Sequence, residues 1–201
     1  MRTRLVTLKR VCVFCGSSTG LRDAHRDAVQ RLGQEIAARG IELVFGGGRT
    51  GLMGVVADAA LAAGGRVIGV IPHAMIAREL AHDGLQDLRV VASMHERKAM
   101  MAELSDAFIA APGGFGTFEE LCEAITWTQL GLHRKRCGLL NVEQFYDPLL
   151  QLVERAVEDG FIRPDSTQII VSERDPAALL SRLSEPFRVP AAVWLLDPEE
   201  T

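Results

Sequence analysis

The sequence predicts an α/β fold built on a doubly wound parallel sheet with helices on both faces. Short apolar runs rich in β-branched residues alternate with longer amphipathic segments, and this alternation is typical of strand–helix–strand units. Several runs are apolar at consecutive positions, which favours strands buried on both faces. A length of 201 residues suits a single domain with one sizeable core and leaves no room for a separate substrate domain.

The elements follow from these patterns in chain order. The apolar runs predict strands at Val11–Cys15, Ile41–Phe45, Val67–Ile71, Arg89–Ala92, Asp106–Ala110, Cys137–Asn141 and Gln168–Val171. Helical spacing predicts helices at Asp23–Arg39, Leu52–Ala63, Met94–Leu104, Phe118–Leu130, Phe145–Asp159 and Pro176–Ser184. In the first helix, for example, Ala28, Leu32 and Ile36 share an apolar face while arginine and aspartate occupy the other.

The two ends of the chain differ from the region between them. Residues 1–9 are basic and lack an apolar core followed by a small-residue cleavage site, so we expect a disordered tail on a cytoplasmic protein. No repeat or linker divides residues 10–185, which we expect to fold together. Residues 186–201 form a proline-containing tail, and its apolar stretch Ala191–Leu196 either packs on the domain, packs on a partner subunit or stays loose.

Charge and hydropathy exclude two classes of partner. The 22 lysines and arginines against 26 aspartates and glutamates give a net charge of −4, so there is no overall basic field for nucleic acid. The longest uncharged run, Ala107–Phe118, has 12 residues, whereas a membrane-spanning helix needs about 18 or more apolar residues. We therefore expect neither a nucleic-acid partner nor a membrane partner.

The cysteines are expected to be buried thiols. Cys12-x-x-Cys15 would suit a redox or zinc site, but no second Cys/His pair stands at ligand spacing. Cys12 instead lies in the apolar run Val11–Phe14, where a reduced thiol behaves as a small apolar side chain. The five histidines are scattered along the chain, so the sequence predicts no metal site.

Three predicted strands end in glycine-bearing turns that lead into helices, at Cys15–Ser18, Gly46–Gly51 and Pro112–Thr117. Such turns let the backbone approach a ligand, and the helix start offers free N–H groups to a phosphate. Gly46, Gly48 and Gly51 match G-x-G-x-x-G, but no carboxylate follows the next strand at the distance expected for a dinucleotide site. This loop alone is equally consistent with tight packing of helix against sheet.

The third turn combines glycines with side chains that can bind a ligand or take part in catalysis. The N–H groups of Gly114, Gly116 and Thr117, with the Thr117 hydroxyl, would cradle one phosphate, and Glu120 follows one helical turn later. Thr117-x-x-Glu120 also matches a capping box, in which Glu120 merely satisfies an amide at the helix start. Both interpretations stay open on spacing alone.

A basic pair, Arg97–Lys98, lies near the start of the helix predicted at Met94–Leu104. Two adjacent cations suit a phosphate dianion through charge-assisted hydrogen bonds. A solvated helix face would look the same in the sequence.

Together these motifs resemble a known family. Pro112–Glu120 fits P-G-G-x-G-T-x-x-E, Phe45–Gly54 fits F-G-G-G-R-T-G-L-M-G, and Met94–Lys98 fits M-H-x-R-K. In that order they are similar to the LOG family, the cytokinin riboside 5′-monophosphate phosphoribohydrolases, whose members were long labelled lysine decarboxylases. The resemblance covers roughly residues 10–165 and implies a Rossmann-like nucleotide-binding catalytic domain and a homodimer.

The resemblance also implies an activity and a set of site residues. The activity is hydrolysis of the N-glycosidic bond of an N6-substituted AMP, releasing the adenine base and ribose 5-phosphate without a cofactor. Arg97 and Glu120 correspond to the catalytic pair. The residues expected to bind substrate are Ser17, Gly46, Gly47, Glu79, Met94, Arg97, Lys98, Gly113, Gly114, Phe115, Gly116, Thr117 and Thr126. Of these, Gly114–Thr117, Arg97 and Lys98 hold the phosphate, and Glu79 lies at the nucleobase end.

The residue types agree with this chemistry. Glycosidic cleavage builds positive charge on the ribose, which a carboxylate such as Glu120 stabilises while it activates water. Arg97 is a poor general acid because its pKa exceeds 12, so we expect it to anchor phosphate and align Glu120. The group that protonates the leaving base stays open between Glu79 and solvent.

One alternative remains, a non-catalytic binding module, whereas a decarboxylase fits the residues poorly. A decarboxylase would need a Schiff-base lysine for pyridoxal phosphate, but the chain has only Lys9, Lys98 and Lys135, and Lys98 beside Arg97 suits a phosphate ligand better. A non-catalytic Rossmann-like nucleotide-binding module would keep the glycine loop but has no need of Glu120.

Overall fold

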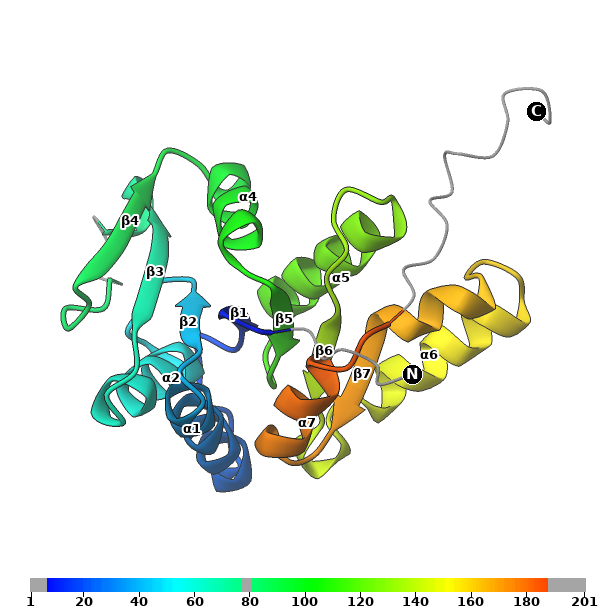
Figure 1. Cartoon of the computed structure of the whole chain (residues 1–201), viewed down its shortest axis with the longest axis horizontal. Coiled ribbons are helices and arrows are strands. Elements are labelled where there is room, and N and C mark those ends of the chain that lie inside the picture. Colours follow the sequence, from blue (N-terminus) through cyan, green and yellow to red (C-terminus); the bar gives the residue numbers. More distant parts are fainter. Residues whose placement is uncertain (1–6, 77–80, 188–201) are drawn as a thin grey trace.

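A computed structural model describes residues 7–76 and 81–187 and shows a seven-stranded parallel sheet (Figure 1). The sheet order is β4-β3-β2-β1-β5-β6-β7. Its strands are β1 (Arg10–Phe14), β2 (Glu42–Phe45), β3 (Val67–Pro72), β4 (Asp87–Val91), β5 (Ala107–Ala110), β6 (Cys137–Leu140) and β7 (Ile170–Glu173). The predicted strands are confirmed, each within two residues of its expected ends.

The helices are α1 (Asp23–Ala38), α2 (Gly51–Ala62), α3 (His73–Ile76), α4 (Met94–Leu104), α5 (Phe115–Gln129), α6 (Asp147–Glu158) and α7 (Pro176–Leu183), with 3₁₀ turns η1 (Val142–Gln144) and η2 (Pro164–Ile169). The six predicted helices are present. Two features differ from expectation: the one-turn helix α3 follows β3 directly, and α5 begins three residues before the predicted Phe118. The earlier start of α5 draws part of the third glycine turn into the helix.

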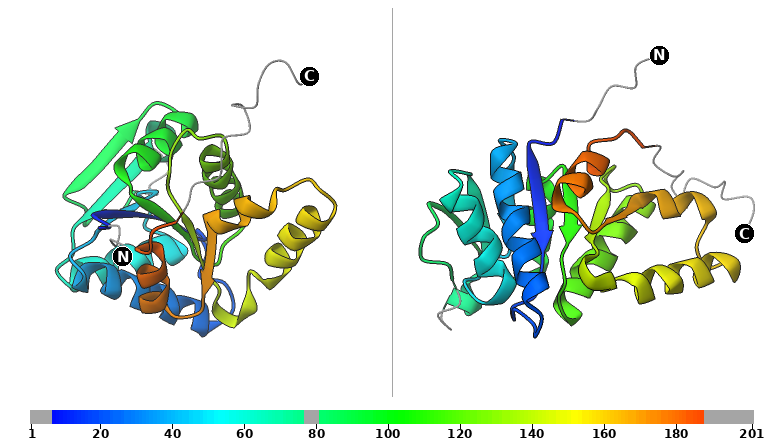
Figure 2. Two further views of the ribbon diagram at one scale, coloured as in Figure 1. Left: turned by 45° about the vertical axis from the view of Figure 1, so that its right-hand side comes forward. Right: turned by 90° about the horizontal axis from the view of Figure 1, so that it is seen from below.

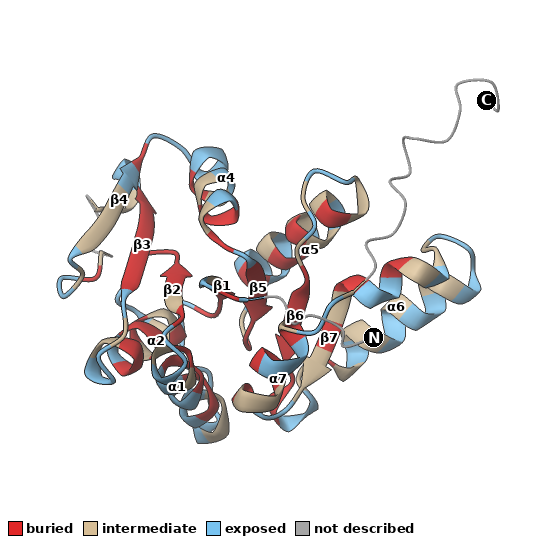
Figure 3. Ribbon diagram, in the orientation of Figure 1, coloured by how far each residue is buried: buried red, intermediate tan, exposed pale blue. Residues whose placement is uncertain are grey.

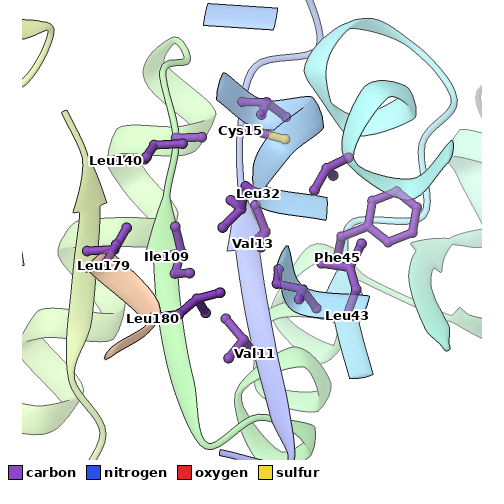
Figure 4. Close-up of a cluster of buried hydrophobic side chains, with 14 of the residues drawn as sticks. Val11, Val13, Cys15, Leu32, Leu43, Phe45, Ile109, Leu140, Leu179 and Leu180 are labelled. Carbon is purple, nitrogen blue, oxygen red and sulfur yellow. The ribbon is translucent and has the colours of Figure 1, made fainter. Parts of the chain in front are cut away.

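Helices cover both faces of the sheet (Figure 2), which confirms the predicted layering. One apolar cluster joins the sheet to α1, α2 and α7, and the other joins it to α4 and α5. Consecutive residues of β1 serve both: Val11 and Val13 point into the first cluster, Cys12 and Phe14 into the second. Figure 4 shows the first cluster around Val11 and Val13. Side chains of a strand alternate between faces, so a strand buried on both sides is apolar at every position.

The burial pattern distinguishes the middle of the sheet from its surroundings. β3 and β5 are buried along their whole length, whereas β4 at the sheet edge is largely half-buried (Figure 3). Cys12, Cys15 and Cys137 are buried free thiols, as predicted for the Cys12-x-x-Cys15 pair, and Cys122 is exposed.

The described part of the N-terminal segment is attached to the domain. Leu8 is buried in the first apolar cluster, and the N–H groups of Lys9 and Arg10 both donate to Asp106 Oδ2. Residues 1–6 of the expected tail, residues 77–80 and residues 188–201 lie outside the described residues. No helix within the described ranges combines the length and the apolar character that a membrane span requires.

The chain reverses its winding between β1 and β5, the two neighbouring strands at the centre of the sheet. The loops that follow them leave toward opposite faces and open a crevice at the carboxyl ends of the strands, where ligands of such sheets bind. The glycine turns after β1 and β5 meet there, since the N–H of Gly16 donates to the Pro112 carbonyl. The end of the Gly46–Gly51 turn joins them, since the N–H of Leu52 donates to the Gly16 carbonyl.

Candidate functional site

The first turn of α5 presents unpaired amides to the crevice. Gly114 is the N-cap, and within residues 7–76 and 81–187 no side chain bonds to the amides of this turn. An α-helix leaves its first N–H groups without intrahelical partners, and here they belong to Phe115, Gly116 and Thr117. Their partial positive charge favours an anion.

The capping box that the spacing of Thr117 and Glu120 left open is not formed. Thr117 is the third residue of α5 and is buried. A Cβ on Gly113 would lie 2.1 Å from Thr117 Oγ1, so only glycine lets the turn fold this closely over Thr117. Because the helix begins at Phe115, Glu120 lies beyond its first turn, too far along to cap it. The capping interpretation was wrong. The Glu120 side chain makes no cap and lines the pocket in the crevice.

Arg97 projects from α4 into the same crevice and is held by the backbone. Its Nε donates to the Val70 carbonyl and its Nη2 to the Gly46 carbonyl, both at 3.1 Å. Nη1 lies 3.8 Å from Glu120 Oε1. The Arg97 side chain is 7% exposed and the Glu120 side chain 12%, so the two charges face each other in a largely dry environment.

Burial raises the pKa of the Glu120 carboxyl above its ordinary value of 4.5, while Arg97 opposes this shift. Desolvation disfavours the charged form of a carboxyl, and a nearby cation favours it. The carboxylate is therefore more basic than an exposed glutamate, which suits a group that accepts a proton or stabilises a cation.

A pocket of about 300 Å³ connects these groups. It is lined by Cys15, Gly16, Ser17, Met53, Met75, Met94, Arg97, Gly114, Phe115, Gly116, Thr117, Glu119 and Glu120. The structure therefore brings together eight of the residues expected at the site. They come from the turn after β1, from α4, and from α5 with its N-cap: Ser17, Met94, Arg97, Gly114, Phe115, Gly116, Thr117 and Glu120.

Lys98 is placed differently from what the sequence suggested. Its ammonium group contacts the carboxylates of Glu119 and Glu123 on α5, and it does not line the pocket. Burial acts to lower the pKa of Lys98, but the hydrogen bonds that it donates to these two carboxylates raise the pKa above the ordinary value. Lys98 joins α4 to α5 beside the Arg97–Glu120 pair.

The remaining expected residues lie around the pocket, away from it or outside the described part. Gly46 and Gly47 lie behind Arg97, where a Cβ on Gly46 would be 1.7 Å from Nη2. Gly113 lines a neighbouring cavity, and Thr126 is exposed on α5 with its hydroxyl donating to the Cys122 carbonyl. Glu79 falls within residues 77–80, outside the described residues.

Two features of the site were not among the sequence predictions. Met53 and Met75 join Met94 on the apolar side of the pocket; Met53 lies inside the F-G-G-G-R-T-G-L-M-G motif, so that motif held a signal for it. A second cavity of about 520 Å³ lies across Gly16, Ser17 and Gly114 and is lined also by Arg22, His25 and Phe145. It is the larger of the two but contains neither Arg97 nor Glu120, so we place the candidate chemistry in the smaller pocket.

The described residues contain no cluster of three or more His, Cys, Asp or Glu side chains that would hold a metal ion.

Known proteins resemble this chain in sequence and in fold. A family model described as "Possible lysine decarboxylase" matches residues 53–183. The probable cytokinin riboside 5′-monophosphate phosphoribohydrolase LOGL9 of Oryza sativa subsp. japonica is 53% identical over 177 residues, which cover 88% of this chain and 78% of that protein. The cytokinin riboside 5′-monophosphate phosphoribohydrolase LOG3 of Arabidopsis thaliana is 51% identical over 177 residues, 88% of this chain and 82% of that protein.

Among solved structures, the Moco Carrier Protein from Chlamydomonas reinhardtii superposes with a TM-score of 0.65 over 87% of this chain and 94% of that one. At 21% identity, this likeness shows the fold, which is Rossmann-like. The sequence matches, which extend over most of both chains at more than half identity, show the family. The chain therefore belongs to the LOG family, the family of the cytokinin riboside 5′-monophosphate phosphoribohydrolases.

Proposed function

We propose that this protein hydrolyses the N-glycosidic bond of an N6-substituted adenosine 5′-monophosphate, releasing the free base and ribose 5-phosphate. The observation that carries the proposal is the buried Glu120–Arg97 pair, set in a pocket whose rim is the uncapped start of α5. Relatives that share about half of their residues with this chain carry the name of that activity.

The phosphate is assigned to the first turn of α5. The free amides of Phe115, Gly116 and Thr117 line the pocket and offer hydrogen bonds and the positive end of the helix dipole. Arg97 adds a fixed positive charge from the neighbouring helix. Lys98 would have to leave Glu119 and Glu123 to reach a ligand, so we do not count it among the phosphate ligands.

Glu120 is assigned to the chemical step. As the bond to the base lengthens, positive charge develops on the ribose ring, and a buried carboxylate stabilises it more strongly than one in water. The same carboxylate, made more basic by burial, takes a proton from the attacking water. The positive charge of Arg97 favours the ionised carboxylate. Arg97 also orients that carboxylate, since its other donors are fixed by the Val70 and Gly46 carbonyls.

A decarboxylase is not supported by this pocket. None of the residues that line it is a lysine, whereas pyridoxal chemistry needs a lysine amine at the reacting carbon. Lys98 is held outside the pocket by two carboxylates.

The test is to incubate the purified protein with isopentenyladenosine monophosphate and, separately, with AMP, and to separate the products by chromatography. We expect free base and ribose 5-phosphate from the N6-substituted nucleotide. Nucleotide binding without release of base from either compound would refute the enzyme and favour a non-catalytic binding module.

We also infer a homodimer in the cytoplasm. The dimer is supported by membership of the family and by apolar side chains left exposed near α6, with Leu152 64% and Phe161 84% exposed. A reducing compartment is supported by the buried free thiols of Cys12, Cys15 and Cys137. Sedimentation at micromolar concentration is expected to show a dimer, and a monomer there would contradict this assignment.

A further inference from the structure

A histidine outside the pocket is connected to Arg97 through the glycine loop that follows β2. The direction of the Arg97 guanidinium depends on that loop, because Nη2 donates to the Gly46 carbonyl at 3.1 Å. The space left for Gly46 is too small for a Cβ, so guanidinium and loop backbone are in direct contact. A displacement of the loop would therefore displace Arg97, whose Nη1 lies 3.8 Å from Glu120 Oε1.

The loop is held in place from its outer side by the segment around His82. The N–H of His82 donates to the Gly47 carbonyl at 2.9 Å, and Gly48 forms an antiparallel bridge with Ala81. Gly47 has a φ of +71°, a conformation that side chains rarely adopt. This backbone pairing fixes the carbonyl next to the one that binds Arg97.

The imidazole ring fixes this segment in turn. Its Nδ1 accepts the N–H of Gly84 at 3.1 Å; a backbone amide only donates, so Nδ1 carries no proton. The ring proton is therefore on Nε2, which lies 3.0 Å from Asp58 Oδ1 on α2 and donates to it. The ring also meets Phe45, the last residue of β2, edge to face. His82 thus ties together the strand before the glycine loop and the helix after it.

We propose that His82 is a positioning residue of the site: it holds the Gly46–Gly48 loop where the Gly46 carbonyl directs Arg97 toward Glu120. The proposal rests on the proposed function. His82 is 8% exposed and does not line the pocket, so it acts through the loop and does not touch the substrate. Misplacement of a catalytic group by about 1 Å costs up to about 10²-fold in rate, so a loosened loop is expected to lower turnover.

The titration of Glu120 distinguishes positioning from a purely structural role. Arg97 lowers the pKa of Glu120 against the larger effect of burial, so a displaced Arg97 raises that pKa further. The other ionisable groups around Glu120 are Lys98 on α4, Glu119 and Glu123 on α5, Cys12 on β1 and Cys15 directly after that strand. None of them contacts His82 in the described structure, so the substitution leaves them in place.

The experiment compares full-length wild type, His82→Ala, His82→Gln and His133→Ala. His133 is a matched control: it is a half-buried histidine whose ring bonds to Thr128 Oγ1, away from the loop. Carbon-13 NMR of labelled glutamate carboxyls, with the Glu120 signal assigned by its loss in Glu120→Gln, reports the pKa without substrate. Turnover at saturating nucleotide is measured on the same samples.

We expect His82→Ala to raise the pKa of Glu120 and to lower kcat about tenfold, with a smaller change in KM. His82→Gln, whose amide can still donate to Asp58, is expected to keep the Glu120 pKa and kcat close to their wild-type values. His133→Ala is expected to change neither the Glu120 pKa nor kcat. A folded His82→Ala protein with the wild-type Glu120 titration would overturn the proposal.

A second variant covers the case in which His82→Ala does not fold. Asp58 is 74% exposed, so Asp58→Ala removes the partner of Nε2 without opening the core. It is expected to shift the Glu120 titration in the same direction by a smaller amount, and an unshifted titration would also overturn the proposal. If the wild type releases no base from any nucleotide, the proposed function fails, while the NMR titration still decides whether His82 positions Arg97.

Discussion

The starts of α4 and α5 lie side by side at the site, carry the same sequence pattern and are built in opposite ways. At α4, Ser93 Oγ accepts the N–H of Glu96, and Glu96 Oε2 accepts the N–H of Ala92. The first bond satisfies one amide of the first turn and the second ties Glu96 to the backbone just before the helix, much as in a capping box. At α5, the pattern Thr117-x-x-Glu120 makes no such bonds, and glycine is the cap.

The same Ser/Thr-x-x-Glu pattern therefore stabilises the start of α4 and supplies the proposed catalytic carboxylate of α5. The side-chain cap of α4 occupies the Glu96 amide, whereas the glycine cap of α5 leaves the amides of that turn open to the pocket. The Glu96 carboxylate of α4 accepts a hydrogen bond from the Ala92 amide, whereas the Glu120 carboxylate faces Arg97. Leaving the start of α5 uncapped is a cost in stability that the proposed phosphate site explains.

The largest expected effect comes from removing the charge of Glu120. Glu120→Gln is expected to lower turnover about 10³-fold, because the variant cannot stabilise the ribosyl cation or take a proton, while AMP still binds. Release of base measures the first effect and calorimetry the second. The matched control is Glu96→Gln on α4, which should keep wild-type turnover. Near-normal activity in Glu120→Gln would show that the Glu120 carboxylate has only a structural role.

The pH dependence follows from the raised pKa of Glu120. Catalysis requires the ionised carboxylate, so kcat is expected to fall about tenfold per pH unit as pH drops below this pKa. The midpoint of this fall in the plot of kcat against pH should therefore lie above 4.5, the ordinary pKa of a glutamate. Measuring kcat at saturating substrate avoids titration of the free phosphate, and returning acid-treated enzyme to neutral pH controls for unfolding. A midpoint at or below 4.5 would contradict the assignment.

Converting the start of α5 into one like that of α4 should weaken substrate binding. Gly114 has a φ of −105° and free space where a Cβ would be, so Gly114→Ser fits without strain. Its hydroxyl would bond to an amide of the first turn, adding a few tenths of a kcal/mol of stability and competing with phosphate. We expect AMP affinity to fall several-fold, as followed by calorimetry. Gly114→Ala adds the carbon without the hydroxyl, and an equal loss in both variants would mean that bulk is the cause.

The smallest effect on activity is expected from Ser93→Ala. Losing this cap should cost about 1 kcal/mol of folding free energy, which lowers Tm by about 2–4 °C for a domain of this size. Turnover of the folded protein should not change, because Ser93 does not line the pocket. Thermal melts and product assays on the same preparation test both statements, and a large loss of kcat would show that the α4 cap also serves the site.

Much of the site was predictable because its residues belong to compact motifs. Arg97, Glu120 and the Gly114–Thr117 turn each stand in a short pattern at the end of a predicted strand or the start of a helix. Lys98 was the exception: adjacency to Arg97 suggested the same ligand, but neighbouring residues on a helix point about 100° apart. That angle directs Lys98 to the carboxylates of α5.

The sequence by itself determined the layering of the protein, because alternating apolar runs and amphipathic segments have few other ways to bury their surfaces. It also determined the parallel sheet and the residue types available to the site. Only the tertiary structure decided where α5 begins, that Glu96 caps while Glu120 faces Arg97, and that His82 fastens the loop behind Arg97. These choices depend on contacts between segments far apart in the chain, whose distances local propensity and spacing do not encode.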